Sequence, residues 1–190
     1  EVEPRSTRHC EFGIYPAGID VRELKTHIAS PVVKQRIADL RRRFGDRKII
    51  VGVDRLDDAF AGIPLKLHAF ERFLTDNPRW HGRVVLIQVA TLPGQASKMN
   101  SAHRAEINES IARINSQFGT LTFSPIHFIT EELDPVEAHA LLCVGHVCMV
   151  TPVRDGMGLV PHEWTVCQHG GNKGAIILSE FAGAAASFAT

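Results

Sequence analysis

Arg55 lies two residues after an apolar run, Ile49–Val53, that is typical of a buried strand. A guanidinium at the end of such a strand presents paired N–H donors, and this fork matches the oxygens of a phosphate group. The alternative is that Arg55 forms an ion pair with a neighbouring carboxylate, Asp54 or Asp57. Taken by themselves, these residues favour an anion site and a local ion pair equally.

A second segment, Thr151–Glu163, combines glycines with acidic residues. Gly156 and Gly158 let the backbone approach a ligand closely, and a helix that begins after them offers free N–H groups to an anion. Asp155 and Glu163 are placed to accept hydrogen bonds from hydroxyl groups of a ligand. The alternative is a glycine-rich turn with capping acids. The segment lacks the third glycine of the dinucleotide-binding fingerprint, which argues against that type of site.

The elements that position these residues alternate along the chain. Five short apolar runs predict strands, at Lys48–Val53, Arg83–Ala90, Phe123–Ile129, His146–Thr151 and Ala175–Ser179. Helical patterns are found at Pro31–Phe44, Pro64–Leu74, Lys98–Phe118, Pro135–Leu142 and Leu159–Gln168. This alternation predicts an α/β fold with a doubly wound parallel sheet, in the strand order 3-2-1-4-5.

In sheets of this class, ligands bind in the crevice beyond the carboxyl ends of the strands. The loop after the first strand carries Arg55, and the loop after the fourth carries Asp155 and the two glycines. We therefore expect Arg55 and the backbone of Gly156–Val160 to converge on one crevice.

The composition restricts the remaining partners. The 190 residues include 21 basic and 21 acidic side chains, so the chain has no net charge to attract nucleic acid or an acidic membrane surface. No apolar run reaches the ~18 residues of a membrane-spanning helix. We expect neither nucleic acid nor a membrane as a partner. The four cysteines form no C-x-x-C motif, which favours free thiols in a reducing, cytoplasmic compartment over disulfides or a metal site.

Ordered blocks over nearly the whole chain point to one family. They are Tyr15–Asp20, Val51–Asp57, Gly62–Glu71, Arg113–Asn115, Phe118–Thr120, Pro125–Phe128, Arg154–Met157 and Leu178–Ala185. Together they resemble the trehalose-6-phosphate synthases, which are retaining glucosyltransferases with two facing Rossmann-like domains. The resemblance implies transfer of glucose from UDP-glucose to glucose 6-phosphate without a metal ion or other cofactor.

The resemblance also implies a domain assignment. Residues 1–29 would be a connecting segment from a missing N-terminal acceptor domain. Residues 30–190 would be the UDP-glucose-binding domain, the second half of the two-domain fold, truncated before its last strand.

Site roles follow from the same resemblance. Arg55 would contact the diphosphate of UDP, and Asp155 would hold a glucose hydroxyl. Glu163 would bind the ribose. Further contacts to the sugar, the phosphate and the uracil would come from the backbone of Gly156, Met157, Gly158, Leu159 and Val160, and from the pair His127 and Phe128.

The sequence departs from the family in the loops that carry this chemistry. The family has a lysine before the glycine of the first loop, as a second cation on the diphosphate, but Ala61 occupies that place here. The loop segment Asp58–Ala61 is one residue longer than in the family, and Phe60 within it could fill part of the pocket. Gly158 replaces an asparagine, and Pro161 enters the same helix start.

These departures lead to two hypotheses. The first is a catalytically weakened, regulatory module of a trehalose-synthesis complex that binds UDP or UDP-glucose weakly and assembles with other subunits. The alternative is the donor domain of an active UDP-glucose:glucose-6-phosphate glucosyltransferase.

Overall fold

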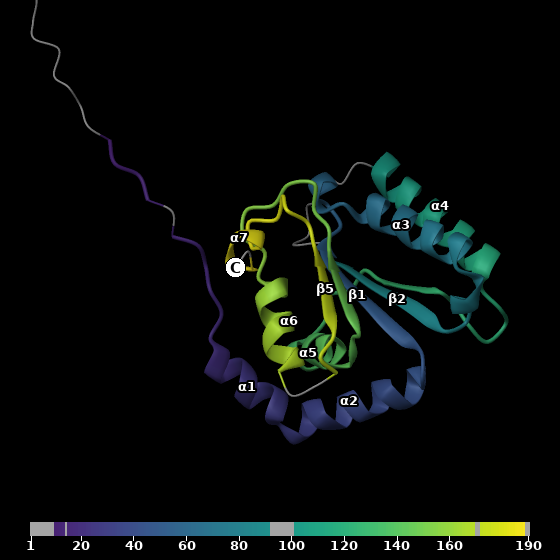
Figure 1. Cartoon of the computed structure of the whole chain (residues 1–190), viewed down its shortest axis with the longest axis horizontal. Coiled ribbons are helices and arrows are strands. Elements are labelled where there is room, and N and C mark those ends of the chain that lie inside the picture. Colours follow the sequence, from purple (N-terminus) through teal and green to yellow (C-terminus); the bar gives the residue numbers. More distant parts are fainter. Residues whose placement is uncertain (1–9, 14, 92–100, 170–171, 189–190) are drawn as a thin grey trace, which may run out of the picture.

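A five-stranded parallel sheet forms the centre of the molecule, with helices on both of its faces (Figure 1). The computed structural model describes residues 10–13, 15–91, 101–169 and 172–188. The strands lie in the order β3-β2-β1-β4-β5, which confirms the predicted fold class and strand order. Their bounds are β1 Lys48–Arg55, β2 Val84–Thr91, β3 Ile126–Ile129, β4 Val147–Val150 and β5 Ala175–Leu178.

The helices agree with the predicted ones to within a few residues at each end, apart from the predicted start at Lys98, which lies outside the described residues. They are α2 Pro31–Phe44, α3 Ile63–Asp76, α4 Ser101–Phe118, α5 Pro135–Val144 and α6 Val160–Gln168. Side chains of Ser30 and Asp134 cap α2 and α5 by accepting hydrogen bonds from backbone N–H groups in the first turn. The described residues also form α1 Val21–Ala29, α7 Ala185–Phe188 and the 3-10 turns η1 Ala59–Ala61 and η2 Pro78–Trp80.

Helix α1 is an element that the sequence analysis did not predict. The carboxylate of Asp20 caps it by accepting hydrogen bonds from the amides of Arg22 and Glu23, and Leu24 is buried against the domain. An acidic cap followed three residues later by a glutamate is a known start signal for a helix, so Asp20 and Glu23 could have revealed it.

Two hydrophobic cores lie on opposite faces of the sheet. Alternate residues of β2 point into each: Val85, Ile87 and Val89 pack beneath α2, α5 and α6, whereas Val84 and Leu86 pack beneath α3 and α4. A strand that is buried on both faces needs apolar residues on both, which explains the continuous run Val84–Ile87 that precedes the buried Gln88.

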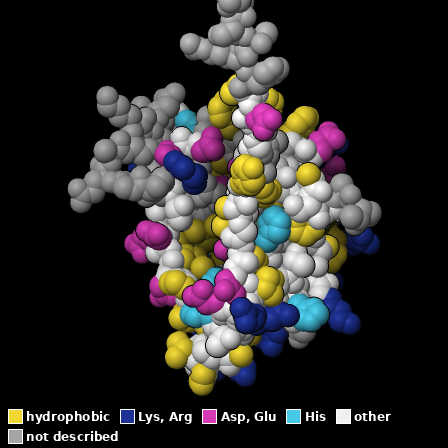
Figure 2. Space-filling model, turned by 90° about the vertical axis from the view of Figure 1, so that its left-hand side faces the viewer, with side chains coloured by type: hydrophobic (Ala, Val, Ile, Leu, Met, Phe, Trp, Pro, Cys, Tyr) yellow, Lys and Arg dark blue, Asp and Glu magenta, His cyan; other side chains and the backbone are white. Residues whose placement is uncertain are grey.

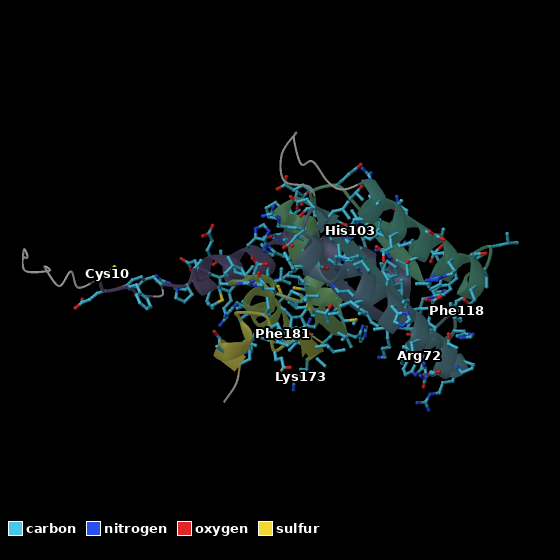
Figure 3. All side chains as sticks on the ribbon, turned by 90° about the horizontal axis from the view of Figure 1, so that it is seen from above. Cys10, Arg72, His103, Phe118, Lys173 and Phe181 are labelled. Carbon is cyan, nitrogen blue, oxygen red and sulfur yellow. The ribbon has the colours of Figure 1, made fainter. Side chains whose placement is uncertain are left out.

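The N-terminal segment extends away from the domain (Figures 1 and 3). Its described residues 10–13 and 15–20 form no strand, and the side chains of Phe12 and Tyr15 are more than nine-tenths exposed. This agrees with the expectation that residues 1–20 pack poorly on the domain, as far as these residues are described. Within the described part of the chain, no helix combines the length and the apolar character needed to cross a membrane.

Candidate functional site

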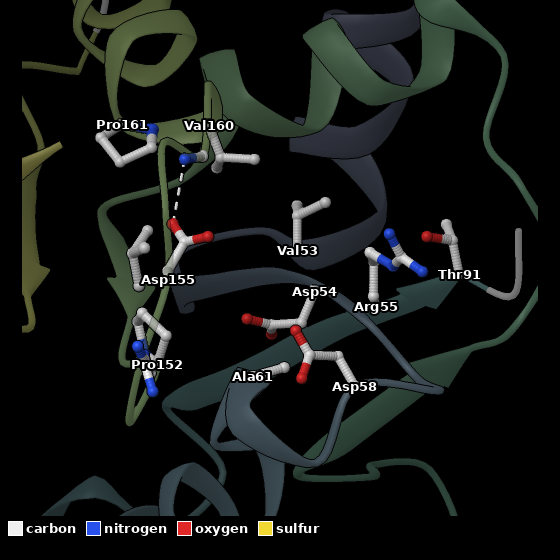
Figure 4. Close-up of a pocket in the computed structure, with 13 residues that line it drawn as sticks. Val53, Asp54, Arg55, Asp58, Ala61, Thr91, Pro152, Asp155, Val160 and Pro161 are labelled. Carbon is white, nitrogen blue, oxygen red and sulfur yellow. Dashed lines mark hydrogen bonds between the residues drawn. The ribbon is translucent and has the colours of Figure 1, made fainter. Parts of the chain in front are cut away.

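The loops after β1 and β4 enclose a pocket of about 240 Å³ at the carboxyl edge of the sheet (Figure 4). Thr91, the last residue of β2, completes its wall. The polar lining residues are Asp54, Arg55, Asp58, Thr91, Arg154 and Asp155. Gly158 and Val160, at the start of α6, also line it, so Arg55 and part of the Gly156–Val160 backbone do converge on one crevice.

A glycine and a backbone hydrogen bond hold the two loops together. Gly62 has φ +76°, and a Cβ atom there would lie 2.1 Å from the carbonyl oxygen of Thr151. The amide of Val153 donates a hydrogen bond of 2.8 Å to the carbonyl oxygen of Phe60 in η1. The longer first loop is therefore fastened to the fourth, and these contacts set the spacing of the pocket walls.

Arg55 satisfies both interpretations of its position. Its guanidinium donates two hydrogen bonds to the carboxylate of Asp57, at 3.2 and 3.0 Å, and this partner raises the pKa of Arg55. Its side chain nevertheless lines the pocket and is 61% exposed. To grip a phosphate, Arg55 would share or leave Asp57.

Asp155 lies across the pocket from Arg55 and is bonded to its own loop (Figure 4). Its Oδ2 accepts a hydrogen bond of 2.9 Å from the amide of Gly158. A Cβ at position 158 would lie 2.9 Å from that oxygen, so the glycine permits this arrangement. Gly183 packs against the same loop so tightly that a Cβ would meet the carbonyl oxygen of Gly156 at 1.4 Å, which is the close-packing explanation for a glycine after β5.

Asp54, which lines the pocket, belongs to a buried ion pair that the sequence analysis did not predict. Lys66 of α3, whose side chain is fully buried, donates to Oδ2 of Asp54 at 2.5 Å. Gln88 of β2 donates to the same oxygen at 2.7 Å. A Cβ on Gly52 would lie 2.7 Å from Nζ of Lys66, so the glycine leaves the space in which these groups meet. Lys66 therefore neutralises Asp54 but is not itself among the residues that line the pocket.

Arg154 is a second cation in the pocket lining, and the sequence analysis did not assign it to the site. Its position next to Asp155, in the same glycine-containing loop, could have indicated it. Lys66 neutralises the charge of Asp54. The remaining charged side chains of the lining are two cations, Arg55 and Arg154, and two anions, Asp58 and Asp155. The pocket thus offers two guanidinium groups but has no excess of positive charge.

Several predicted site residues lie elsewhere. Glu163 lines a separate pocket between α1, α5 and α6, together with Asp20, His27 and His139, and burial raises the pKa of Glu163. Phe60 does not fill the candidate pocket, because its side chain is 57% exposed and lies outside the lining.

The uracil pair is also outside the pocket lining. The ring of His127 packs edge to face against Phe44, with 5.6 Å between the ring centres, and burial lowers the pKa of His127. Phe128 packs against the core beneath α3 and α4. Gly156, Met157 and Leu159 belong to the loop but do not line the pocket. The nucleotide contacts assigned to these residues stay predictions. The loop after β2 lies mostly at residues 92–100, outside the described residues.

The family model of glycosyltransferase family 20 matches residues 3–190. The chain belongs to this family. An alpha,alpha-trehalose-phosphate synthase (UDP-forming) of Yarrowia lipolytica is 46% identical over 180 residues, which are 95% of this chain and 38% of that protein. The family 20 chain described here therefore spans about two-fifths of the length of this relative.

Solved structures of the family have the same fold. The N-terminal domain of Candida albicans trehalose-6-phosphate phosphatase superposes with a TM-score of 0.83 at 36% identity, over 90% of this chain and 36% of that one. A UDP-forming synthase of Burkholderia xenovorans, solved in complex with glucose-6-phosphate, has a TM-score of 0.83 at 31% identity, over 90% of this chain and 38% of that one. The fold thus occurs in proteins named as synthases and in one named as a phosphatase.

Proposed function

We propose that this chain is the donor-nucleotide domain of a trehalose-6-phosphate synthase-like protein in trehalose biosynthesis. In this proposal UDP or UDP-glucose binds weakly in the pocket between the first and fourth loops, without a metal ion. The protein acts as a non-catalytic or regulatory module beside an acceptor domain and other subunits of a cytoplasmic complex.

One observation carries the assignment of the ligand. Arg55, Arg154 and the start of α6 line a single pocket at the carboxyl edge of a parallel sheet. Two guanidinium groups and the positive end of a helix dipole suit a diphosphate, and they would stabilise it as a leaving group when a glycosidic bond breaks. The printed name of the Yarrowia relative, a UDP-forming synthase, agrees with this ligand class.

The residues that line the pocket also support the proposed weakening of UDP binding. Asp58 places a carboxylate where the ligand is anionic, and Ala61 supplies no charge where the family has a lysine. At the helix start, Asp155 already accepts the hydrogen of the Gly158 amide, and Pro161 has no N–H to offer. Asp58 would repel the anion, and the other features leave the pocket with fewer free donors for it.

An active glucosyltransferase is the second candidate. The 46% identity to a UDP-forming synthase favours it, and so does the presence of Arg55, Asp155 and Glu163. The two candidates share the donor pocket and differ in turnover. Formation of trehalose 6-phosphate by the full-length protein would support the second candidate, and UDP binding without turnover would support the first.

Calorimetric titration of the full-length protein with UDP tests the donor pocket that both candidate functions share. We expect Arg55→Gln to weaken UDP binding about tenfold, because a charge-assisted hydrogen bond contributes about 1.5–3 kcal/mol. Arg72→Gln is the matched control, since Arg72 is exposed on α3 and pairs with Asp76 away from the pocket (Figure 3). UDP binding that is equally strong in both variants would contradict a diphosphate site at Arg55.

Restoring the family's loop tests the proposed weakening. Replacing residues 58–61 of the full-length protein by three residues that end in lysine should tighten UDP binding about tenfold or more, since it removes Asp58 and adds a cation. A loop of equal length that ends in glutamine separates the effect of charge from that of spacing. Tight UDP binding and normal synthase activity in the unaltered protein would show that the missing lysine is dispensable.

A further inference from the structure

Helices α1 and α2 carry the same short sequence pattern, Lys-x-x-Ile-Ala. It occupies Lys25–Ala29 in α1 and Lys34–Ala38 in α2, and Arg41 follows one turn after the second copy. Residues three and four positions apart lie on the same face of a helix. Each helix therefore presents a lysine and, one turn later, an isoleucine and an alanine on one face.

Both copies of the pattern line one open groove of about 820 Å³ between α1, α2 and α6. Their lysines, isoleucines and alanines all belong to its lining, together with Arg41 of α2 and Val166 of α6. The two isoleucines are partly buried and pack against the core, whereas both lysines and Arg41 are exposed. The groove thus combines a partly buried apolar surface with exposed basic side chains.

The positive charges of this groove are not compensated within the described part of the chain. None of the described residues that line it is acidic, and no ion pair between described residues involves Lys25, Lys34 or Arg41. The carboxylate of Asp39, also on α2, pairs instead with Arg42. On the face that Figure 2 shows, Lys and Arg side chains gather in the lower part, at the level of α1 and α2. In a chain without net charge, the groove is a local basic site.

The groove lies at the opposite end of α6 from the candidate pocket. Val160, the first residue of α6, lines the pocket, whereas Val166 and His169, at the other end, line the groove. A helix rises by about 1.5 Å per residue, so roughly 14 Å separates the two ends of this nine-residue helix. A partner in the groove would leave the pocket open, and its binding does not depend on the proposed donor function.

We propose that this groove binds an acidic amphipathic helix of a partner protein. Carboxylates of the partner would pair with Lys25, Lys34 and Arg41, and its apolar stripe would cover the isoleucines and alanines between them. A helix packs closely into the groove between two others where the side chains are small, and Ala29 and Ala38 provide such positions. The apolar contact supplies affinity, and the basic side chains select an acidic partner.

Fluorescence anisotropy of a labelled synthetic peptide, titrated with the full-length protein at low salt, tests the proposal. The peptide has about 14 residues, with leucine at every third or fourth position and glutamate elsewhere, so that one face of its helix is apolar and the other acidic. We expect the peptide to bind. The double variant Lys25→Glu with Lys34→Glu should lower its affinity about tenfold or more, because two attractions become repulsions. Glutamine in place of the peptide's glutamates, or serine in place of its leucines, should also weaken binding.

Arg79→Glu with Arg104→Glu is the matched control for this charge reversal. Both arginines are exposed and lie outside the groove, on η2 and α4, and the change in net charge is the same. This variant should bind the peptide as the unaltered protein does. Circular dichroism establishes that each variant is folded. If the charge reversal disturbs folding, Lys25→Gln with Lys34→Gln replaces it and should show a several-fold loss of affinity.

Two results would contradict the proposal. Failure of the unaltered protein to bind the peptide, or equal affinities in the groove variant and the control variant, would show that the groove is not a docking site for an acidic helix. An oligouridylate, or vesicles of phosphatidylserine in phosphatidylcholine, could bind more tightly than the peptide and lose that binding in Lys25→Glu with Lys34→Glu. Such a result would overturn the choice of a protein as the partner.

Discussion

Replacing Lys66 with methionine is expected to lower the free energy of unfolding by about 3–5 kcal/mol. Lys66 and Asp54 form an ion pair in which both side chains are almost fully buried, at 0% and 7% exposure. Removing one partner leaves the other charge in a poorly solvated site, and this is far more costly than the loss of an exposed pair. Urea denaturation of the unaltered protein and the variant measures the difference.

Two further variants make this result specific. Arg72→Met removes one partner of the exposed pair Arg72–Asp76 and should leave the free energy of unfolding almost unchanged. The double variant Lys66→Met with Asp54→Asn should recover much of the loss, because it leaves no uncompensated charge. A cost below about 1 kcal/mol for Lys66→Met alone would mean that the pair is not buried in solution.

Gly62→Ala is expected to destabilise the protein by roughly 2–4 kcal/mol. An L-residue at φ +76° is strained by about 1 kcal/mol, and the added Cβ would also lie 2.1 Å from the carbonyl oxygen of Thr151. The loops must separate to relieve that contact, and overpacking of this kind costs about 1–3 kcal/mol more. Thermal unfolding followed by circular dichroism measures the change.

Gly82→Ala separates the two causes. Gly82 has nearly the same backbone angle, φ +72°, but nothing lies within 4 Å of a Cβ at that position. Gly82→Ala should therefore lower the free energy of unfolding by about 1 kcal/mol, from the backbone angle alone. Equal losses in the two variants would contradict the view that Gly62 is needed for contact between the first and fourth loops.

Charge in the candidate pocket depends on contacts that sequence order does not reveal. Asp54 and Asp57 both flank Arg55, yet Asp57 is the partner of Arg55, whereas Asp54 pairs with Lys66 from the following helix. From residue types alone, an anion site and a local ion pair were equally favoured interpretations of Arg55. The structure shows that an ion pair and a place in the pocket lining are compatible, because the guanidinium lies at the pocket wall and stays largely exposed.

The sequence by itself determined the sheet. Continuous apolar runs such as Val84–Ile87 require burial on both faces, and the helical patterns between the strands require parallel strands with crossover connections, so few strand orders remain. The place of the pocket followed as well, since the carboxyl ends of neighbouring strands meet at one edge. These inferences succeed because they depend on periodicity and on chain direction, which are local properties.

Tertiary structure decided which side chains share that edge and with what partners. Glu163 is in the first turns of α6, yet α1 packs beside it and gives it a separate pocket with Asp20. Arg154 lines the candidate pocket together with Arg55 from another loop. Such encounters depend on helix rotation and on close approaches such as that of Gly62 to Thr151. They are set by packing between distant segments, which no local pattern encodes.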